Sequence, residues 1–554
     1  MLSPMLRPRL LSVVVVSLVL GTAACSAGTS TPPDPSIEPG TGAGVLLPAA
    51  NGGPHGVPPA DGTAPNVYTT TKISEGMIRS AVNKLDDIAA ATMKRSGVPG
   101  MAIAVVHGGK VLYAKGFGVR ELGKADKVNT DTVFQVASVS KSVSSTCISA
   151  AVTDKIVSWS DPVVKYMPEF TLSDPAVTKM VTIGDFFSHR SGVPGLAGND
   201  LEGFGFDREQ ILAKLNQFPL QQFRTTYDYS NFGMTAGAEA VVRASGKPWD
   251  KLCADELFAK TGMTTASYSY DDFLTRPNRT ALHFPVGDVG DGKFAPLYTR
   301  DADAQAPAGG LSASVKDMAA WMNMVLATGK AGNTQVIDPS VFMEEFTSQA
   351  INARTTTPEG RSRTYGYGVN VDIESTGHVR WWHSGAFYVG AGTNYQIIPG
   401  ADVGIVVLTN AAPLGIAETV ATSFTDLVRT STVERDWLGF FGPGFGALYD
   451  NHSVVANPPP ASPKPARPLS DYVGIYTNPY VGDVSVTESG GKLTVTLGPK
   501  NLSAPLTHYD GDVFSWLAPG GNGDPVSAIT FGGPAGQATT MNIELLVVPQ
   551  LTRR

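Results

Sequence analysis

The sequence predicts an α/β (α+β) fold in which one antiparallel sheet, flanked by helices and joined to a helical region, is followed by a small all-β C-terminal domain. Two β-rich runs meet at Gly108-Gly109, and further strand-like runs return only after residue 365. The long stretch between them has helical periodicity, which favours a helical insert beside the sheet.

The first half of the main domain begins with a helix. Its apolar spacing starts after Ser74, a residue suited to capping a helix N-terminus, and ends near 95–97. The runs 101–107 and 110–117 flank the Gly-Gly pair and predict a β-hairpin. Later segments with helical spacing are 139–151, 233–244, 249–260 and 314–326.

The second half of the main domain returns to strands and closes with a helix over 416–429. The strand-like runs are 365–373, 378–382, 392–398 and 403–408. Helices at both ends of a strand-rich chain predict a sheet that its terminal helices cover.

Composition divides the chain into five parts. We predict a lipoprotein-type signal peptide over 1–24, a Pro/Gly-rich tether over 25–71, the main domain over 72–435, a Pro-rich linker over 436–468 and a small β-barrel-like domain over 469–554. The last part has short alternating strands separated by Gly-rich turns, which is typical of a small all-β module.

The N-terminus carries a targeting signal. Two arginines precede the apolar run 10–20, which is too short to span a bilayer, and small residues then lead to Cys25. This pattern resembles a bacterial lipoprotein signal cleaved before a lipidated cysteine, although Thr22 stands where such signals more often carry Leu. We expect an exported protein anchored at the extracytoplasmic face of the cell membrane through Cys25; the alternative is ordinary cleavage and a secreted product.

Charge and cysteine content exclude several classes of function. The net charge is 42 − 49 = −7, or 40 − 49 = −9 without the signal, which argues against nucleic-acid binding. Because anionic lipids do not attract a negative protein, acyl chains rather than charge would hold it to a membrane. No C-x-x-C or H-E-x-x-H motif occurs, so we expect no metal and no cofactor. We expect Cys147 and Cys253 to be two buried thiols, with one disulfide as the alternative.

The strongest chemical signal is Ser138-Val139-Ser140-Lys141. Residues at positions i and i+3 of a helix share a face, so the Lys141 amine can lie near the Ser138 hydroxyl and activate it as a nucleophile. The same S-x-x-K spacing at 489–492 falls in a Gly-rich turn between strands and receives no role.

Two weaker motifs follow along the chain. In Tyr229-Ser230-Asn231 the phenol could serve as a general base if cations lower its pKa, and the amide could orient Lys141; the structural alternative is a packed tyrosine with an Asn that caps a helix. In His383-Ser384-Gly385 the histidine and glycine share one face of a strand, where glycine admits a substrate; a lone His is more often structural.

The order S-x-x-K, Y-S-N, H-S-G resembles the serine β-lactamase and penicillin-recognising family, in its class C and D-alanyl-D-alanine carboxypeptidase branch. The resemblance covers about 74–430 and includes the framing segments 98–102, 188–194 and 308–312. It implies a β-lactamase/transpeptidase-like fold. The C-terminal module looks like the lipocalin-like domain that follows such hydrolase domains in some bacterial proteins.

The resemblance also implies roles for single residues. Ser138 would be the acyl-accepting nucleophile, Lys141 and Tyr229 the proton-transfer pair, and Asn231 the group that orients the substrate. His383 and Gly385 would line the pocket, and the backbone N–H groups of Ser138 and Ala386 would form the oxyanion hole. His189 is expected to be a packing residue.

The third motif departs from the usual Lys-Thr-Gly of β-lactamases. A histidine that is mostly neutral holds a substrate carboxylate less firmly than lysine does, and H-S-G is closer to the peptidase and esterase relatives. We therefore expect an exported serine hydrolase that cleaves an ester, amide or peptide bond through a Ser138 acyl-enzyme, acting on a small-molecule or peptide substrate. The alternatives are a D-alanyl-D-alanine carboxypeptidase, a β-lactamase proper, or a non-catalytic penicillin-binding-type envelope protein; a G-x-S-x-G elbow is absent.

Overall fold

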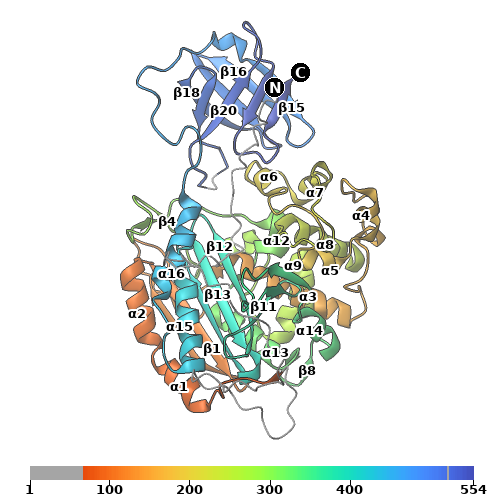
Figure 1. Ribbon diagram of the computed structural model, residues 1–554, viewed down its shortest axis with the longest axis vertical. Helices are drawn as coiled ribbons and strands as arrows, with labels where there is room; N and C mark the ends of the chain where they lie inside the picture. Colours follow the sequence, from red (N-terminus) through yellow and green to blue (C-terminus); the bar gives the residue numbers. More distant parts are fainter. Residues whose placement is uncertain (1–66, 521–522) are drawn as a thin grey trace, which may run out of the picture.

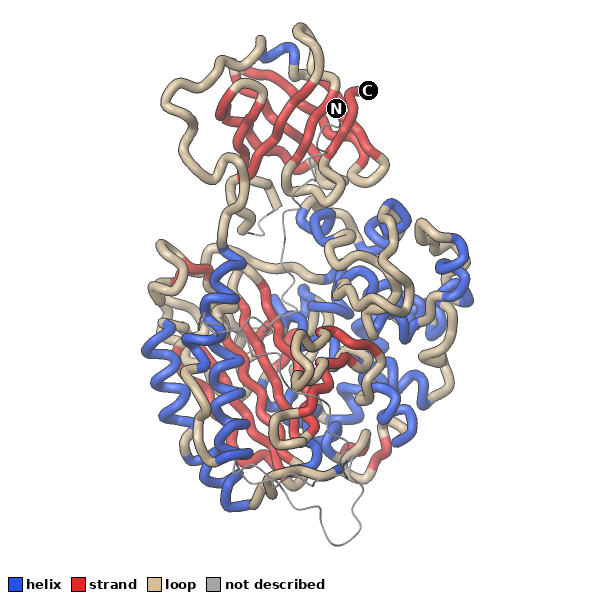
Figure 2. The backbone as a smooth tube through the Cα atoms, viewed as in Figure 1, coloured by secondary structure: helices blue, strands red, loops and turns tan. Residues whose placement is uncertain are grey.

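The computed structural model describes residues 67–520 and 523–554. It contains an eight-stranded antiparallel sheet, a helical region beside it and a separate closed barrel above them, so the predicted fold class is confirmed (Figures 1 and 2). The predicted signal peptide, Cys25 and most of the predicted tether lie outside the described residues.

The large sheet has the order β2-β1-β14-β13-β12-β11-β10-β9. Its strands are β1 (Gly100–His107), β2 (Lys110–Gly118), β9 (Ala350–Ala353), β10 (Arg363–Tyr365), β11 (Asn370–Ile373), β12 (Val379–Phe387), β13 (Ala391–Ile398) and β14 (Val403–Thr409). The central strands β13 and β14 are buried along their whole length because helices cover both faces, which explains the nearly continuous apolar sequence of β14.

One face of the sheet is covered by helices from both ends of the main domain. These are α1 (Glu75–Asn83), α2 (Leu85–Ser96), α15 (Ile416–Thr430) and α16 (Trp437–Gly446) (Figure 1). Side chains of α1, α2 and α15 form one buried cluster with β1 and β14, to which Leu85, Ile103 and Phe424 belong.

The helical region lies against the other face and the side of the sheet. Its helices are α3 (Ser140–Thr153), α4 (Pro175–Met180), α5 (Ile183–Phe187), α6 (Asn199–Gly203), α7 (Arg208–Leu212), α8 (Asn231–Ser245), α9 (Trp249–Cys253), α10 (Ala259–Thr261), α11 (Tyr270–Thr275), α12 (Ala306–Gly309), α13 (Val315–Leu326) and α14 (Pro339–Glu345). Three two-stranded sheets complete it: β3 (Phe134–Gln135) with β6 (Ser312–Ala313), β4 (Phe284–Pro285) with β5 (Phe294–Ala295), and β7 (Lys330–Ala331) with β8 (Thr334–Gln335).

Several elements differ from the prediction in detail. The first helix is two helices that meet at Lys84, and the segment 249–260 contains a π-helical turn over Ala254–Phe258. The predicted strand 365–373 is divided into β10 and β11. Gly368 makes the turn between them with a φ of 70°, and a Cβ there would lie 2.5 Å from the Lys141 carbonyl oxygen.

The first part of the segment predicted as a linker, 436–468, is helical. Asp436 caps helix α16 by accepting a hydrogen bond from Gly439 N at 3.2 Å, and Phe441 and Phe445 are buried. The Trp-Leu-Gly-Phe-Phe sequence supplies the apolar surface that packs this helix onto α15. The exposed Pro-rich stretch begins only later, near residue 457.

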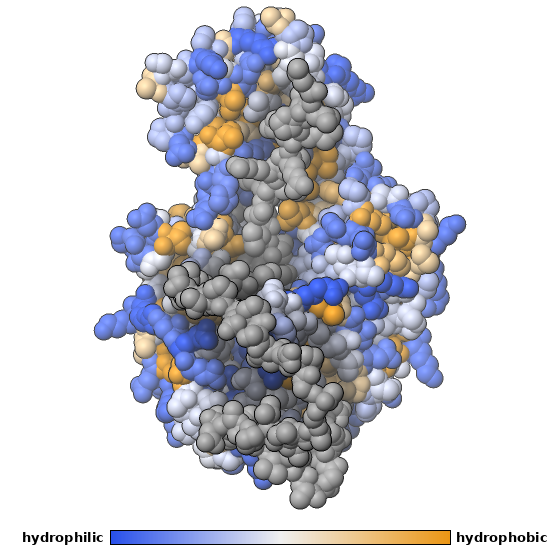
Figure 3. All heavy atoms as spheres, in the orientation of Figure 1, coloured by the Kyte–Doolittle hydropathy of each residue, from blue (hydrophilic) through white to orange (hydrophobic). Residues whose placement is uncertain are grey.

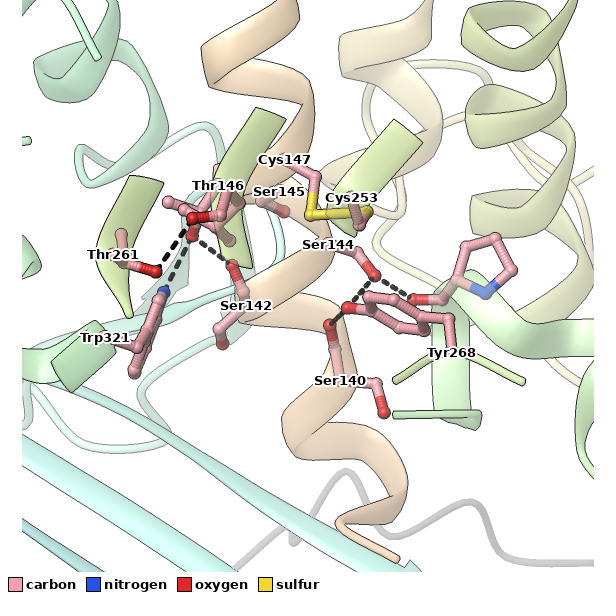
Figure 4. The surroundings of a disulfide bond; sticks show 12 residues. Ser140, Ser142, Ser144, Ser145, Thr146, Cys147, Cys253, Thr261, Tyr268 and Trp321 are labelled. Carbon is pink, nitrogen blue, oxygen red and sulfur yellow. Dashed lines mark hydrogen bonds between the residues drawn. A yellow bond between two sulfur atoms is a disulfide. The ribbon is translucent and has the colours of Figure 1, made fainter. Parts of the chain in front are cut away.

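The expectation of two free buried thiols is wrong, because Cys147 and Cys253 form a disulfide. Figure 4 shows the bond between helix α3 and the end of α9, where the two Cα atoms are 5.3 Å apart. Both side chains are fully buried, and they are 106 positions apart in the sequence. Spacing along the sequence carries no information on this pairing, since it depends on how the two helices pack.

The C-terminal domain is a closed eight-stranded antiparallel barrel. Its strands are β15 (Gly474–Asn478), β16 (Gly482–Ser489), β17 (Lys492–Leu497), β18 (Leu502–Asp510), β19 (Val513–Trp516), β20 (Ser527–Gly532), β21 (Thr540–Ile543) and β22 (Gln550–Arg553). The run 542–548, predicted as a strand, leaves the barrel at Ile543 and turns back before β22. Large apolar side chains such as Tyr476, Trp516 and Phe531 fill the interior.

The described surface is mainly polar. Figure 3 shows hydrophilic residues over most of the face in view, with hydrophobic residues in small patches, one of them near the junction of the barrel and the helical region. Across 67–520 and 523–554, no helix combines the length and the hydropathy that crossing a membrane requires.

Candidate active site

Ser138 lies in a short 3-10 helix, Ala137–Val139, between strand β3 and helix α3. Ala137 has a φ of 49°, a conformation that costs energy for a residue with a side chain and that the surroundings must hold in place. Val136 supplies that support, because its N–H donates to Leu311 O at 2.9 Å and its carbonyl accepts from Thr393 Oγ1 at 2.7 Å. The predicted nucleophile therefore stands on a sharp, firmly held turn.

Lys141 lies one turn later in α3 and is fully buried. Its Nζ is 3.2 Å from Ser138 Oγ, 2.8 Å from Asn231 Oδ1 and 2.8 Å from Ala308 O. Burial lowers the pKa of this amine well below its ordinary value. The structure thus brings the serine and the lysine of the S-x-x-K motif into direct contact.

The contacts of Lys141 indicate how a neutral amine would be oriented. A neutral amine has two N–H donors and one lone pair. The two closest acceptors, Asn231 Oδ1 and Ala308 O, can take both donors. The lone pair then faces Ser138 Oγ, where it can accept the hydroxyl proton. This arrangement is suited to general-base activation of the serine.

Tyr229 packs against the same amine, with its ring centroid 4.5 Å from Lys141 Nζ. Burial raises the pKa of its phenol, and a hydrogen bond with Ser138 acts in the opposite direction. The phenol is therefore protonated at neutral pH, contrary to the lowered pKa that a general-base role for Tyr229 would need. It can donate or relay a proton, whereas Lys141 is the better base.

The Tyr-Ser-Asn segment is fixed by its neighbours. Ser230 caps helix α8 by accepting from Gly233 N at 3.0 Å, and its own N–H donates to His189 Nδ1 at 3.1 Å. His189 is buried, and its ring lies 4.5 Å from that of Tyr229. The histidine expected to be a packing residue thus holds the backbone of this motif.

Asn231 is the first residue of α8 and uses both ends of its amide. Its Oδ1 accepts from Lys141, and its Nδ2 donates to Asn199 Oδ1 at 3.3 Å. The second contact fixes which end of the amide faces the amine.

The third motif lies on strand β12. His383 is buried; its Nδ1 is 2.6 Å from Ser384 O and its Nε2 is 3.0 Å from the Tyr365 hydroxyl. Burial lowers the pKa of His383 to about 3, so the ring is neutral at physiological pH. It does not offer a positive charge for a substrate carboxylate.

Gly385 allows β12 to approach the nucleophile. A Cβ at this position would lie 2.2 Å from Val136 O, 2.3 Å from Thr393 Oγ1 and 3.1 Å from Ser138 N. Any side chain would therefore push the strand away from Ser138. Ala386, the predicted second oxyanion donor, is the next residue on this strand. Tyr229 and His383 also line a cavity of about 340 Å³, whose lining does not include Ser138 or Lys141.

Sequence reasoning missed three groups of the site. They are the main-chain oxygen of Ala308, the amide of Asn199 and the hydroxyl of Tyr365. Ala308 lies in a framing segment, but a carbonyl acceptor leaves no trace in residue type. Within the described part of the chain, no group of three or more His, Cys, Asp or Glu side chains could hold a metal ion.

Comparison with known families agrees with this geometry. The beta-lactamase family model matches residues 85–425, and a domain of unknown function, DUF3471, matches 458–553. An unguisins hydrolase of Aspergillus campestris is 26% identical over 338 residues, which are 59% of this chain; the chain spans only 60% of that relative's length. Penicillin-binding protein 4 of Amycolatopsis lactamdurans is 29% identical over 60% of this chain and 84% of its own.

Solved structures show the same fold. The octameric penicillin-binding protein homologue from Pyrococcus abyssi superposes with a TM-score of 0.55 at 18% identity, covering 85% of this chain and all of its own. A class C beta lactamase from Rhodobacter sphaeroides gives a TM-score of 0.50 at 19% identity over 62% of this chain and 98% of its own. Because the family model matches more than half of the residues, the chain belongs to the β-lactamase family and carries a C-terminal DUF3471 domain folded as an eight-stranded barrel.

Proposed function

We propose that the protein is a serine hydrolase that cleaves an ester, amide or peptide bond through an acyl-enzyme on Ser138. The observation that carries the proposal is the environment of Lys141, whose buried amine has two fixed acceptors and faces Ser138 Oγ. This arrangement costs stability, because a buried amine loses its hydration, and such a cost is typical of functional sites.

The reaction would proceed in two steps. The Ser138 hydroxyl passes its proton to Lys141 Nζ while Oγ attacks the substrate carbonyl carbon and forms a C–O bond. The negative charge that develops on the carbonyl oxygen would be held by the N–H groups of Ser138 and Ala386. The leaving group takes a proton, from Lys141 directly or through Tyr229, as its bond to carbon breaks. Water then attacks the ester to Ser138, with the same groups accepting and returning the proton.

The ionisable side chains of the three motifs favour substrates without a free carboxylate next to the cleaved bond. The His383 ring is neutral, and Lys141 is held as an amine. Efficient carboxypeptidase or β-lactamase activity relies on a firm grip on a carboxylate, so we place ester and internal amide bonds first. Two fungal relatives are named as hydrolases of unguisins, which supports a hydrolase activity.

The experiment that tests the function is covalent labelling followed by intact mass spectrometry. Wild-type protein should react with a serine-directed fluorophosphonate and turn over an activated short-chain ester, and Ser138→Ala should abolish both. Ser489→Ala is the matched control, because it removes the serine of the other S-x-x-K sequence, located in the turn between β16 and β17, and should change neither.

Parallel incubations distinguish the alternatives. A stable adduct with penicillin and no turnover of esters or peptides would support a penicillin-binding protein without hydrolase activity. Release of D-alanine from a D-alanyl-D-alanine peptide, or rapid loss of penicillin, would assign the carboxypeptidase or β-lactamase activity instead. A wild-type protein that no reagent labels contradicts the proposal.

We also propose that the protein acts outside the cytoplasm, held at the membrane by lipid on Cys25. The support is the sequence alone, in which a short apolar run and small residues precede Cys25 and a Pro/Gly-rich segment follows it.

A further inference from the structure

The short helix α6 touches the active site on one side and the barrel on the other. Figure 1 shows it directly below the barrel. Its first residue, Asn199, accepts a hydrogen bond from Asn231, and the side chain of its next residue, Asp200, accepts hydrogen bonds from the barrel and from its own helix. Two consecutive residues therefore face different domains.

The barrel holds Asp200 with two donors. The hydroxyl of Tyr480 donates to Oδ1, and Val547 N donates to Oδ2 at 2.8 Å. Tyr480 is fully buried, and its hydroxyl also accepts from Gly198 N at 3.2 Å. One side chain of the barrel thus fixes both the residue that precedes α6 and the carboxylate within it.

Close backbone contacts support the same junction. A Cβ at Gly498 would lie 2.2 Å from Phe204 O, and one at Gly520 would lie 2.3 Å from Gly203 O. The Phe204 ring stacks on Trp516 with centroids 6.2 Å apart. Glycines at these positions let the barrel approach the end of α6 more closely than other residues would allow.

A second path leads from α6 to the other acceptor of Lys141. Glu202 accepts from Gln305 Nε2 at 2.5 Å and pairs with Arg300. Gln305 immediately precedes helix α12, which carries the Ala308 carbonyl. Both groups that orient the Lys141 amine, Asn231 and Ala308, are consequently tied to helix α6, which the barrel contacts.

We propose that Asp200 and Tyr480 are positioning residues that couple the C-terminal barrel, through helix α6 and Asn199, to the amide of Asn231 and hence to the amine of Lys141. The inference rests on the proposed hydrolase function and gives the barrel a part in it: without the Tyr480–Asp200 contact, α6 shifts and Asn231 no longer holds Lys141 with its lone pair toward Ser138. The coupling acts on the chemical step and not on substrate binding.

The test compares two tyrosines of the barrel in the full-length chain. Tyr472 matches Tyr480 closely: it is fully buried, its hydroxyl donates to Asp512 Oδ1 at 2.7 Å, and it accepts from Arg467 N at 3.0 Å, but all its partners lie at or within the barrel. Tyr480→Phe should lower kcat for an activated ester about tenfold with KM unchanged, as expected for one buried hydrogen bond. Tyr472→Phe should cost similar thermal stability and keep kcat within about twofold.

A double-mutant cycle checks the path. Asn199→Ala alone should lower kcat, and combined with Tyr480→Phe it should lower kcat no further than the larger single effect, because both changes release the same amide. Asp200→Asn, which leaves one of the two barrel donors without an acceptor, should act like Tyr480→Phe.

The outcomes separate this inference from the function on which it rests. Wild-type protein that no serine reagent labels would end both. If Ser138 is labelled, three results would each overturn the coupling but keep the proposed hydrolase function. They are a wild-type kcat in Tyr480→Phe, equal losses of kcat in the two tyrosine variants, and additive effects in the double-mutant cycle.

Discussion

The ionisation of Lys141 controls the proposed reaction. Below its lowered pKa the amine is an ammonium ion and cannot accept the Ser138 proton, so acylation should slow as pH falls through that pKa. Asn231→Asp places a carboxylate where Oδ1 now lies, 2.8 Å from Nζ, and a neighbouring anion raises the pKa of an amine.

We therefore expect Asn231→Asp to lose about 100-fold in acylation rate at neutral pH and to recover part of the loss in alkaline buffer. The pH profile of activated-ester hydrolysis measures both effects. A profile that coincides with that of the wild-type protein would show that Lys141 is not the base.

Glu345 is a second buried ionisable residue, at the end of α14. Ser149 Oγ donates to its Oε2 at 2.6 Å, and Thr146 Oγ1 lies 3.2 Å from Oε1. The Thr146 hydroxyl has one proton, which it can donate either to this oxygen or to Ser142 O at 2.7 Å (Figure 4 shows Thr146 beside Ser142). Burial outweighs these hydrogen bonds and raises the pKa of Glu345 to about 8.

Stability should consequently depend on pH through Glu345. In the unfolded chain this carboxyl ionises above 4.5, whereas in the folded protein it stays protonated to about pH 8, so its contribution is full at low pH and is lost as pH rises between these values. Glu345→Gln mimics the protonated acid. Its free energy of unfolding should equal that of the wild type at acidic pH and exceed the wild-type value by on the order of 2–4 kcal/mol near pH 8. Denaturant unfolding at several pH values measures this. The exposed neighbour Glu344→Gln is the control, and equal pH dependence in wild type and Glu345→Gln would refute the argument.

At the scale of helices and strands, long apolar patterns were predictable and local turns were not. The hairpin of β1 and β2 and helix α15 follow from periodicity, because each buries a continuous face or stripe. The 3-10 turn at Ser138, with a positive φ at Ala137, depends on the hydrogen bonds that Val136 donates to Leu311 and accepts from Thr393, both far along the chain. The motif residues of the site were predictable from type and order, whereas Asn199 and the Ala308 carbonyl act only through tertiary contacts.

The disulfide belongs to this scale because it joins two helices. Cys147–Cys253 ties α3, which follows the turn that carries Ser138, to the end of α9, and it joins positions 106 apart in the sequence. Cys147→Ala with Cys253→Ala should lower the free energy of unfolding by about 2–4 kcal/mol, since an unfolded chain without the cross-link gains entropy. The turn around Ser138 keeps its own contacts, so ester hydrolysis well below the unfolding temperature should persist. Thermal unfolding with and without reductant checks this, and a wild-type transition that does not respond to reductant would contradict it.

At the scale of the whole molecule, the two folded domains form one working unit. The barrel contributes Tyr480 and the N–H of Val547 to a helix of the catalytic domain, and Glu202 of that helix reaches the segment before α12. An exposed Pro-rich stretch near 457–465 connects the domains, and the contacts at α6 help to place the barrel. The barrel is in this way linked to the residues that orient Lys141 through α6, a helix of five residues.

We expect the protein to be attached to the membrane through lipid on Cys25. The mature chain would carry a net charge of 40 − 49 = −9, which anionic lipids repel, so attachment would depend on acyl chains at Cys25. Cys25→Ser should move the protein from the membrane to the soluble fraction and abolish incorporation of an alkyne fatty acid. Cys147→Ala with Cys253→Ala serves as the control, because it removes the other two cysteines of the chain and should leave both readouts unchanged. If Cys25→Ser stays with the membrane, a contact of the folded domains must hold it there, and the lipid anchor is refuted.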